Sequence, residues 1–424
     1  MLRRIRISNY KSFGSLDLEL RPLMVIMGPN AAGKSNFLDA LNLLSQLGTR
    51  ESLKAAFENH RGLPLETVCY AEGGIEDTLD KEAVGFSFQV DVELSPSTLM
   101  EVHQLRSDRQ GKLASRLGSA RGLAHRLLRY GLSLELLPRT GELRVTEETL
   151  VPLRSDFRVK TKPKAFLHRL DGQARIRVED TRRAYYGLLG IPNNRTAVSA
   201  PLAAEYFPYL NALRLELGKW QTHYLEPRVL TRDDVPIADA RTMGPRGENF
   251  AALLNTLKIT DPPAFDNFQR TVQHVLPTRP RVDVEVNRKD GTLGLRIREG
   301  ELTFSGRLIS EGTLRVLGLV AAIRPESPAV LVGYEEPENG VHPVRIRSIA
   351  DMLKNASSVY GKQIIVTTHS PLFAKWFRAD DLFVCRKAGR YSVIEPLRTA
   401  GPLLDGEDIE RALGDSMARG DLDG

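Results

Sequence analysis

The chain has 424 residues, of which 42% are hydrophobic and 26% are charged, a balance typical of a folded protein with room for two lobes. Its two cysteines, Cys69 and Cys385, cannot form a disulfide framework. No stretch approaches the roughly 18 apolar residues of a membrane span, and the start MLRRIRISNYKSF lacks the apolar run of a signal peptide. We therefore expect a cytoplasmic protein with no membrane partner. The net charge of +6 is a weak indication of a negatively charged partner.

The start of the chain predicts two strands, because apolar and polar residues alternate at 5–7 and again at 16–20. A fully apolar strand follows at 23–27 and leads into the segment GPNAAGKSN, residues 28–36. A helix comes next, with an apolar face made of Phe37, Leu38, Leu41 and Leu44. A strand, a glycine-rich loop and a helix in this order are the context in which a phosphate-binding loop is expected.

The middle of the chain predicts antiparallel strands with one solvated face, because alternation is strict at 84–92 and recurs at 132–136 and 143–145. The basic segment Arg106–Arg129 is expected to be helical. It could contact nucleic-acid phosphates, or it could equally be a solvated helix face. The region 151–230 is punctuated by prolines, and we expect mixed helical pieces there.

The last third of the chain predicts a parallel sheet covered by helices. A hairpin should come first, with 282–286 pairing with 293–297 across Asp290 and Gly291. The following elements are expected to be a helix from Ser310, the strand AVLVGY, a helix over 343–357, the strand QIIVTTH and a terminal hairpin over 381–397. Buried strands that alternate with helices are typical of a parallel sheet.

Residues 28–35 match the phosphate-binding loop pattern in full. Its glycines allow backbone N–H groups to surround phosphate oxygens, and the following helix N-terminus favours negative charge. Lys34 should reach the outer phosphates, and the Ser35 hydroxyl should ligate Mg²⁺. The alternative is a glycine turn that happens to precede a helix. The expected ATP contacts are Gly28, Pro29, Asn30, Ala31, Ala32, Gly33, Lys34, Ser35 and Asn36.

Two adjacent carboxylates, Glu335 and Glu336, end an apolar strand, and Pro337 stops that strand. Beside a phosphate-binding loop, one acid can hold Mg²⁺ through its water shell and the next can polarise the attacking water. From their order we expect Glu335 to be the metal-side acid and Glu336 the catalytic one. Two acids at a strand end can also be solvated loop residues.

A histidine, His369, ends the next apolar strand, QIIVTTH. In a phosphate-loop sheet this is the position of a residue that senses the outer phosphate, so we expect His369 to take part in catalysis. The alternative is a core or edge histidine that bonds to a backbone group.

The stretch RLISEGTLRVLGL, read alone, is the start of an amphipathic helix capped by Ser310. Taken with the loop, the paired acids and the histidine, its order along the chain resembles that of the ATP-binding-cassette (ABC) ATPases. Within them the chain is similar to the RecF, SMC and OLD-type group. The phrases SEGTLR, EEPENGVHP and VTTHSP are most similar to those of bacterial stand-alone predicted AAA-family ATPases.

The resemblance implies an α/β fold, a P-loop ABC-type ATPase head with a mixed sheet, helices and an antiparallel β lobe. It places an inserted mixed or helical lobe between two parts of the head, because the loop and the Ser310 helix are far apart in the chain. The expected division is 1–95, 96–235 and 236–424.

The resemblance also makes Ser310, Glu311 and Gly312 the signature motif, which in this family contacts the γ-phosphate held by the other subunit. It therefore implies a homodimer, or a higher oligomer, that forms with ATP. The loop Pro337–Pro343 would join the two sites, although Glu338, Asn339 and His342 could instead belong to an exposed turn.

Two features depart from the family pattern. The metal-side acid is Glu335 rather than an aspartate, and no glutamine loop can be placed, because Gln46 lies inside the first helix. Residues 58–62 could fill the position of that loop. Lys11 could approach nucleotide or DNA, or be a solvated lysine.

The implied function is an ATPase switch that uses ATP and Mg²⁺ in DNA repair or anti-phage defence. DNA and a nuclease or toxin effector are the candidate partners. The alternative is a regulatory scaffold that uses ATP as structural glue to hold an effector inactive. A fused nuclease is disfavoured, because the chain after His369 is too short for a typical domain core.

Overall fold

The computed structural model describes residues 1–58, 60–70, 74–110, 123–159, 165–170, 172–179, 184–231 and 235–397. The chain divides into two compact units. The first comprises residues 1–21, 39–220 and 387–394, and the second comprises residues 22–38, 221–386 and 395–424. The predicted division, a head formed by 1–95 and 236–424 around an inserted lobe at 96–235, stays a prediction. The centre of the predicted basic helix, 111–122, lies outside the described residues, and its predicted end is wrong, because residues 127–129 begin strand β5.

The first unit contains an eight-stranded antiparallel sheet with the order β2-β1-β4-β5-β6-β7-β8-β9. Burial alternates along β5, so one face of the sheet packs into a core and the other is more accessible. This confirms the predicted antiparallel β lobe. The strands are β1 (Leu2–Tyr10), β2 (Phe13–Glu19), β4 (Val84–Glu93), β5 (Leu127–Leu137), β6 (Glu142–Pro152), β7 (Leu167–Leu170), β8 (Gln173–Glu179) and β9 (Ala184–Gly190).

Strands β7 to β9 lie where the sequence predicted helical pieces, so that prediction is wrong for residues 167–190. In β7 the next inward-facing residue after Leu167 is Arg169, which is 0% exposed. Arg169 lies 3.6 Å from the equally buried Glu148 of β6. A charged residue at an inward position breaks the apolar alternation by which a strand is recognised.

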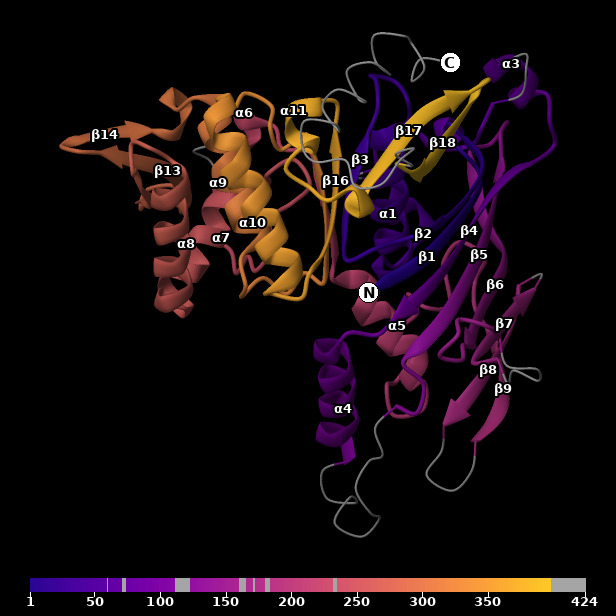
Figure 1. Ribbon diagram of the computed structural model, residues 1–424. Helices are drawn as coiled ribbons and strands as arrows, with labels where there is room; N and C mark the ends of the chain where they lie inside the picture. The colour runs from indigo at the N-terminus through magenta and orange to yellow at the C-terminus, as the bar shows by residue number, and fades with distance from the viewer. Residues whose placement is uncertain are drawn as a thin grey trace. The chain divides into compact units, whose positions relative to one another are not determined.

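Strands β15, β16 and β3 and most of β17 belong to the second unit and are parallel, within a sheet of the order β10-β15-β16-β3-β17-β18 (Figure 1). Strands β3 and β16 are buried along their whole length, as expected for parallel strands covered on both faces. This confirms the predicted parallel sheet. The strands are β3 (Leu23–Met27), β10 (Trp220–His223), β15 (Leu331–Glu335), β16 (Gln363–Thr368), β17 (Leu382–Ala388) and β18 (Tyr391–Pro396).

A smaller antiparallel sheet in the second unit consists of β11 (Val235–Pro236), β12 (Arg281–Asn287), β13 (Thr292–Glu299) and β14 (Leu302–Ser305). The predicted hairpin is confirmed, because Val282 pairs with Ile297 and Val284 with Leu295. Its turn uses Gly291 at φ +66°, in the left-handed region that favours glycine. Helices α7 (Phe250–Thr260) and α8 (Pro262–Val275) pack beside this sheet (Figure 1).

The remaining helices flank the sheets and connect their strands. The segment expected to be helical over 343–357 begins with a 3₁₀ turn and continues as α10. No helix in the described part of the chain is both long and apolar enough to span a membrane. The helices are α1 (Lys34–Thr49), α2 (Leu53–Phe57), α3 (Gly74–Leu79), α4 (Pro96–Gln110), α5 (Pro208–Gly218), α6 (Pro227–Leu230), α9 (Glu311–Ile323), α10 (Ile346–Ser358) and α11 (Pro371–Ala374), with 3₁₀ turns at Pro64–Thr67, Gly306–Leu308, Pro343–Arg345 and Ala379–Asp381.

Candidate active site

The loop of residues 28–33 joins the carboxyl end of β3 to the start of α1, as predicted. A Cβ atom at Gly28 would lie 2.1 Å from the carbonyl oxygen of Cys385 on β17, so a larger residue does not fit there. Ala31 (φ +64°) and Gly33 (φ +111°) have left-handed backbone conformations. The chain therefore curls tightly before the helix, which turns backbone N–H groups toward one point.

Lys34 occupies the centre of this curl and is 5% exposed. Its ammonium group donates hydrogen bonds to the carbonyl oxygens of Gly28 and Pro29, each at 2.7 Å. Burial lowers the pKa of Lys34, and the carboxylates of Glu336 and Glu335 act in the opposite direction. The loop thus surrounds a cation that would attract the outer phosphates of a nucleotide.

Ser35, in the first turn of α1, donates a hydrogen bond from its hydroxyl to Oε1 of Glu335 at 2.5 Å. Glu335 is the last residue of β15 and pairs with Thr367 of the parallel strand β16. Hydroxyl and carboxylate oxygens are ligands that Mg²⁺ accepts. No cluster of three or more His, Cys, Asp or Glu side chains suited to a metal ion occurs among the described residues. Two protein oxygens fit a Mg²⁺ ion that takes its other ligands from phosphate and water.

Glu336 follows the strand end and is held from several sides. Its backbone has φ +48°, which is unusual for a residue other than glycine, and its N–H donates to the carbonyl of Thr367 at 2.9 Å. Its Oε1 lies 3.0 Å from Nδ1 of His369, and its Oε2 accepts a hydrogen bond from the Asn339 side-chain amide. The structure therefore brings the two residues predicted to be catalytic, Glu336 and His369, into direct contact.

Glu338 lies behind this pair and is 7% exposed, so the alternative of an exposed turn is wrong for this residue. Its Oε1 accepts a hydrogen bond from the hydroxyl of Thr368, while Oε2 has no hydrogen-bond partner among the described residues. Burial raises the pKa of Glu338. Neither Thr368 nor the inward direction of Glu338 was predicted from the sequence. The third acid in EEPEN and the threonine before the histidine were the available signals.

Ser310 caps α9, and its hydroxyl oxygen accepts the N–H of Thr313 at 3.3 Å, which confirms the predicted helix start. Ser310 and Glu311 are exposed, whereas Gly312 is buried. A Cβ atom at Gly312 would lie 1.9 Å from the carbonyl oxygen of Gly340. The loop that follows Glu336 therefore packs directly against the start of α9. Contact of Ser310 with a nucleotide on a second subunit stays a prediction.

The structure also shows the contacts of Lys11 and Gln46, two residues singled out in the sequence. Lys11 forms an ion pair with Asp39 at 2.7 Å, and its side chain is 11% exposed, so it is not a freely solvated lysine. Gln46 lies on α1 and accepts a hydrogen bond from Arg50 of the same helix. Within 58–62, Asn59 lies outside the described residues and Nε2 of His60 lies 2.8 Å from the hydroxyl of Tyr10, so a loop with the glutamine-loop role there stays a prediction.

Two family models match parts of the chain. Residues 1–157 match a family model described as "AAA ATPase domain", and residues 211–375 match one described as "AAA domain, putative AbiEii toxin, Type IV TA system". An OLD nuclease of Thermus scotoductus is 43% identical over 44 residues, which cover 10% of this chain and 8% of the nuclease.

The fold is similar to that of a solved SMC head. An SMC head bound to the C-terminal winged-helix domain of ScpA is similar with a TM-score of 0.55 and 12% identity, over 93% of this chain and 97% of that chain. The SMC head of Pyrococcus yayanosii, solved with a coiled coil and joint, matches with a TM-score of 0.48 and 11% identity, over 98% of this chain and 99% of that chain.

Proposed function

We propose that the chain is an ABC-type ATPase of the RecF, SMC and OLD-like group, and that it binds and hydrolyses ATP as a conformational switch. One observation carries this proposal. The phosphate-loop serine, the strand-end acid Glu335 and the neighbouring pair of Glu336 and His369 converge at the carboxyl edge of one parallel sheet. In open α/β sheets this edge is where ligands bind.

The loop and Lys34 bind the triphosphate in this proposal. The backbone N–H groups of residues 30–35 and the positive end of α1 surround the phosphate oxygens. Lys34 exchanges the carbonyls of Gly28 and Pro29 for the outer phosphates. Ser35 and Glu335 would hold Mg²⁺, which neutralises charge on the β- and γ-phosphates when it is bound.

Glu336 acts on the attacking water. Asn339 fixes one oxygen of the carboxylate and His369 contacts the other, so the group is oriented before substrate arrives. The carboxylate orients the water and accepts its proton, and the exposed edge of His369 donates a hydrogen bond to the γ-phosphate. The left-handed backbone of Glu336 turns the carboxylate out of the strand line and toward the loop.

The site is completed, we propose, by a second copy of the chain. Ser310 is exposed at the N-terminus of a 13-residue helix, and such a position offers backbone N–H groups and a hydroxyl to an anion. ATP enclosed between two copies would stabilise the closed dimer, and hydrolysis would release it.

The biological task we propose is a DNA transaction in repair or anti-phage defence, with a nuclease or toxin effector as partner. The short match to an OLD nuclease and the family model that includes a toxin support this proposal. The alternative is a scaffold in which ATP serves as structural glue.

The rate of ATP hydrolysis distinguishes the ATPase switch from the scaffold. Purified protein with saturating Mg-ATP should release phosphate faster than about 0.01 per second, whereas structural glue should be far slower than this. The Glu336→Gln protein should bind ATP with unchanged affinity and lose at least about 100-fold in kcat, because only the proton acceptor is removed. Lys34→Ala should weaken ATP binding at least about tenfold. Bound ATP without turnover in the parent protein would favour the scaffold.

A further inference from the structure

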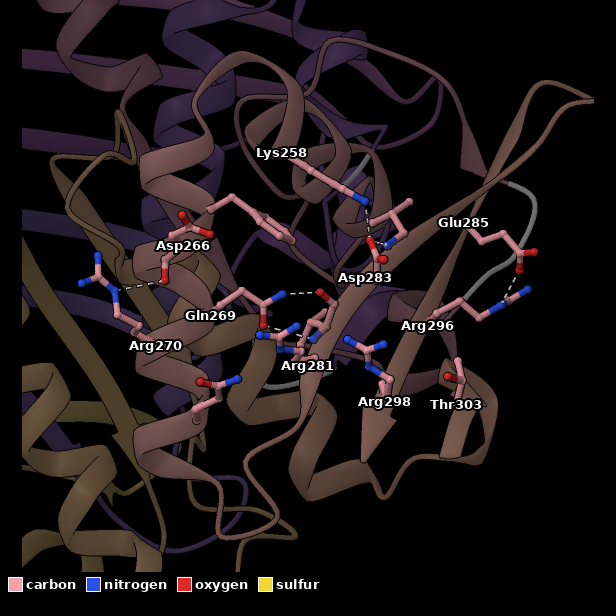
Figure 2. A pocket seen from close by; sticks show the side chains of 14 residues that line it. Lys258, Asp266, Gln269, Arg270, Arg281, Asp283, Glu285, Arg296, Arg298 and Thr303 are labelled. Atoms are coloured by element: carbon pink, nitrogen blue, oxygen red, sulfur yellow. Dashed lines mark hydrogen bonds and ion pairs between the residues drawn. The ribbon is translucent and has the colours of Figure 1, made fainter. Parts of the chain in front are cut away.

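The second unit has a groove of about 950 Å³ that is distant in sequence from the phosphate loop (Figure 2). One side of the groove is formed by α8, and its floor is the exposed face of β12 and β13, with Thr303 of β14 at the far end. Five of the lining side chains are basic: Lys258, Arg270, Arg281, Arg296 and Arg298. Only three are acidic, so the lining has an excess of positive charge.

Two of the three acids already pair with cations inside the groove. Asp283 pairs with Lys258 of α7 at 2.6 Å, and Glu285 pairs with Arg296 at 2.6 Å. Figure 2 shows both pairs as dashed contacts at the same side of the groove. The acids on the sheet face are therefore already used to neutralise Lys258 and Arg296.

Two arginines in the groove have no such partner. Arg281 of β12 and Arg298 of β13 are directly opposite each other in the strand register, so their side chains leave the same face of the sheet. Both are exposed, and neither forms an ion pair or side-chain hydrogen bond with any described residue. Like charges at directly opposed positions destabilise an antiparallel pair. An anion that binds both guanidinium groups would convert this repulsion into attraction.

The edge of the groove is closed to an added β-strand. β12 is an edge strand, and the amide of Gln269 on α8 accepts the N–H of Val282 at 3.1 Å and donates to its carbonyl. This contact occupies backbone groups that an extended peptide would need. It also fixes α8 against the sheet, so the wall and the floor of the groove are held together.

We propose that this groove binds the phosphodiester backbone of a nucleic acid, with one phosphate between Arg281 and Arg298. Planar guanidinium groups bind phosphate oxygens through paired, charge-assisted hydrogen bonds. The groove is too large for a single anion, and Arg270 and Thr303 provide further donors along it. The blocked strand edge disfavours an extended acidic peptide. The proposal is independent of ATP turnover, because none of these residues belongs to the ATP site.

The test uses the full chain and two fluorescein-labelled probes of arbitrary sequence, a 30-base single strand and its duplex. Binding is followed by fluorescence anisotropy at several KCl concentrations. The R281Q/R298Q protein should bind at least about tenfold more weakly at low salt, because it loses charge-assisted hydrogen bonds. Its slope of log affinity against log salt should fall by about 1, as expected for one lost phosphate contact.

The matched control is R154Q/R241Q, which removes the same charge from side chains that are 59% and 81% exposed and lie outside the groove. The control should bind like the parent protein, and phosphate release from ATP should be unchanged in both variants. A control that weakens binding as much as R281Q/R298Q would overturn the proposal. So would unchanged binding by R281Q/R298Q, or groove-dependent binding of poly-glutamate in place of nucleic acid.

A second variant keeps the proposal testable if R281Q/R298Q does not fold. Arg298→Glu places an acid opposite Arg281, so it should preserve or raise the melting temperature while it abolishes groove binding. If Arg298→Glu is well folded and binds both probes with the parent affinity, the groove does not bind phosphate.

Discussion

Glu336 is the residue on which the proposed chemistry depends, and its orientation is set by neighbours that do not react. Asn339 donates to one carboxylate oxygen, and His369 contacts the other. Asn339 follows the buried Glu338 in the chain, and His369 follows Thr368. The hydroxyl of Thr368 donates a hydrogen bond to Glu338. At the residue scale, the proposed site is therefore one acid, Glu336, whose carboxylate is held by Asn339 of the following loop and by His369 at the end of β16.

Removal of the Asn339 amide should therefore affect catalysis more than binding. Asn339→Ala should lower kcat roughly tenfold or more with little change in KM, because the carboxylate loses an orienting hydrogen bond and gains rotamer freedom. Steady-state phosphate release measures both constants. Asn339→Asp places a second negative charge beside Glu336 and should be at least as slow. An unchanged kcat in Asn339→Ala would show that the contact has no positioning role.

His223 provides a test of pH dependence at the level of one residue. It is 1% exposed on β10, its Nδ1 lies 3.3 Å from the carbonyl oxygen of Gly244, and burial lowers its pKa to about 4. Since the unfolded chain binds the proton near pH 6.5, stability is full above that pH and is lost as the pH falls toward 4. Between pH 7 and pH 5, His223 should account for about 2 kcal/mol of lost unfolding free energy.

Urea unfolding of His223→Gln at pH 7 and pH 5 measures this contribution. Glutamine retains a donor for Gly244 but does not titrate, so the difference between the two pH values should shrink by about that amount. An identical pH dependence in the parent and the variant would mean that His223 is not buried in its neutral form.

At the scale of elements, the start of α9 and the loop after β15 form one packed pair. Gly312 and Gly340 are in contact through the backbone, and no side chain separates them. The loop in turn carries Glu338 and Asn339, which contact the catalytic edge of the sheet. We expect a change at the proposed ATP site to reach the start of α9 through these contacts.

Gly312→Ala should disrupt this packing. The added methyl group would lie 1.9 Å from the carbonyl oxygen of Gly340, so the helix or the loop must move. We expect a loss of roughly 1–3 kcal/mol in unfolding free energy, together with slower turnover. Gly190→Ala is the matched control, because a methyl group there would meet nothing within 4 Å. Equal stability of the two variants would contradict the close packing.

Elements were predictable from the sequence where local patterns agree with packing. The strand, loop and helix at 23–49 and the hairpin at 282–297 were placed correctly, because glycine turns and regular alternation mark them. Strand β7 was missed because Arg169 occupies a buried position, and its compensating acid, Glu148, lies on another strand. The inward direction of Glu338 was missed for a related reason. Which residue of a turn faces inward depends on the segment that packs against it.

At the scale of the whole molecule, the proposed ATP site and the exposed start of α9 both belong to the second unit. The parallel sheet presents the phosphate loop and the paired acids, while α9 presents Ser310 to the outside. We propose that two such chains enclose ATP. Ser310→Arg should then leave ATP binding to one chain intact and prevent closure, because a large cation would occupy the position of the signature hydroxyl.

The most direct test of this account is the solution mass of the Glu336→Gln protein with and without Mg-ATP, determined by light scattering after size exclusion. Slow hydrolysis in this variant should preserve the closed state, so we predict that the mass doubles with Mg-ATP. The same measurement on Glu336→Gln combined with Ser310→Arg should give a monomer with ATP bound. Dimerisation of the double variant, or a monomeric Glu336→Gln protein with ATP demonstrably bound, would contradict a site completed by the second chain's Ser310.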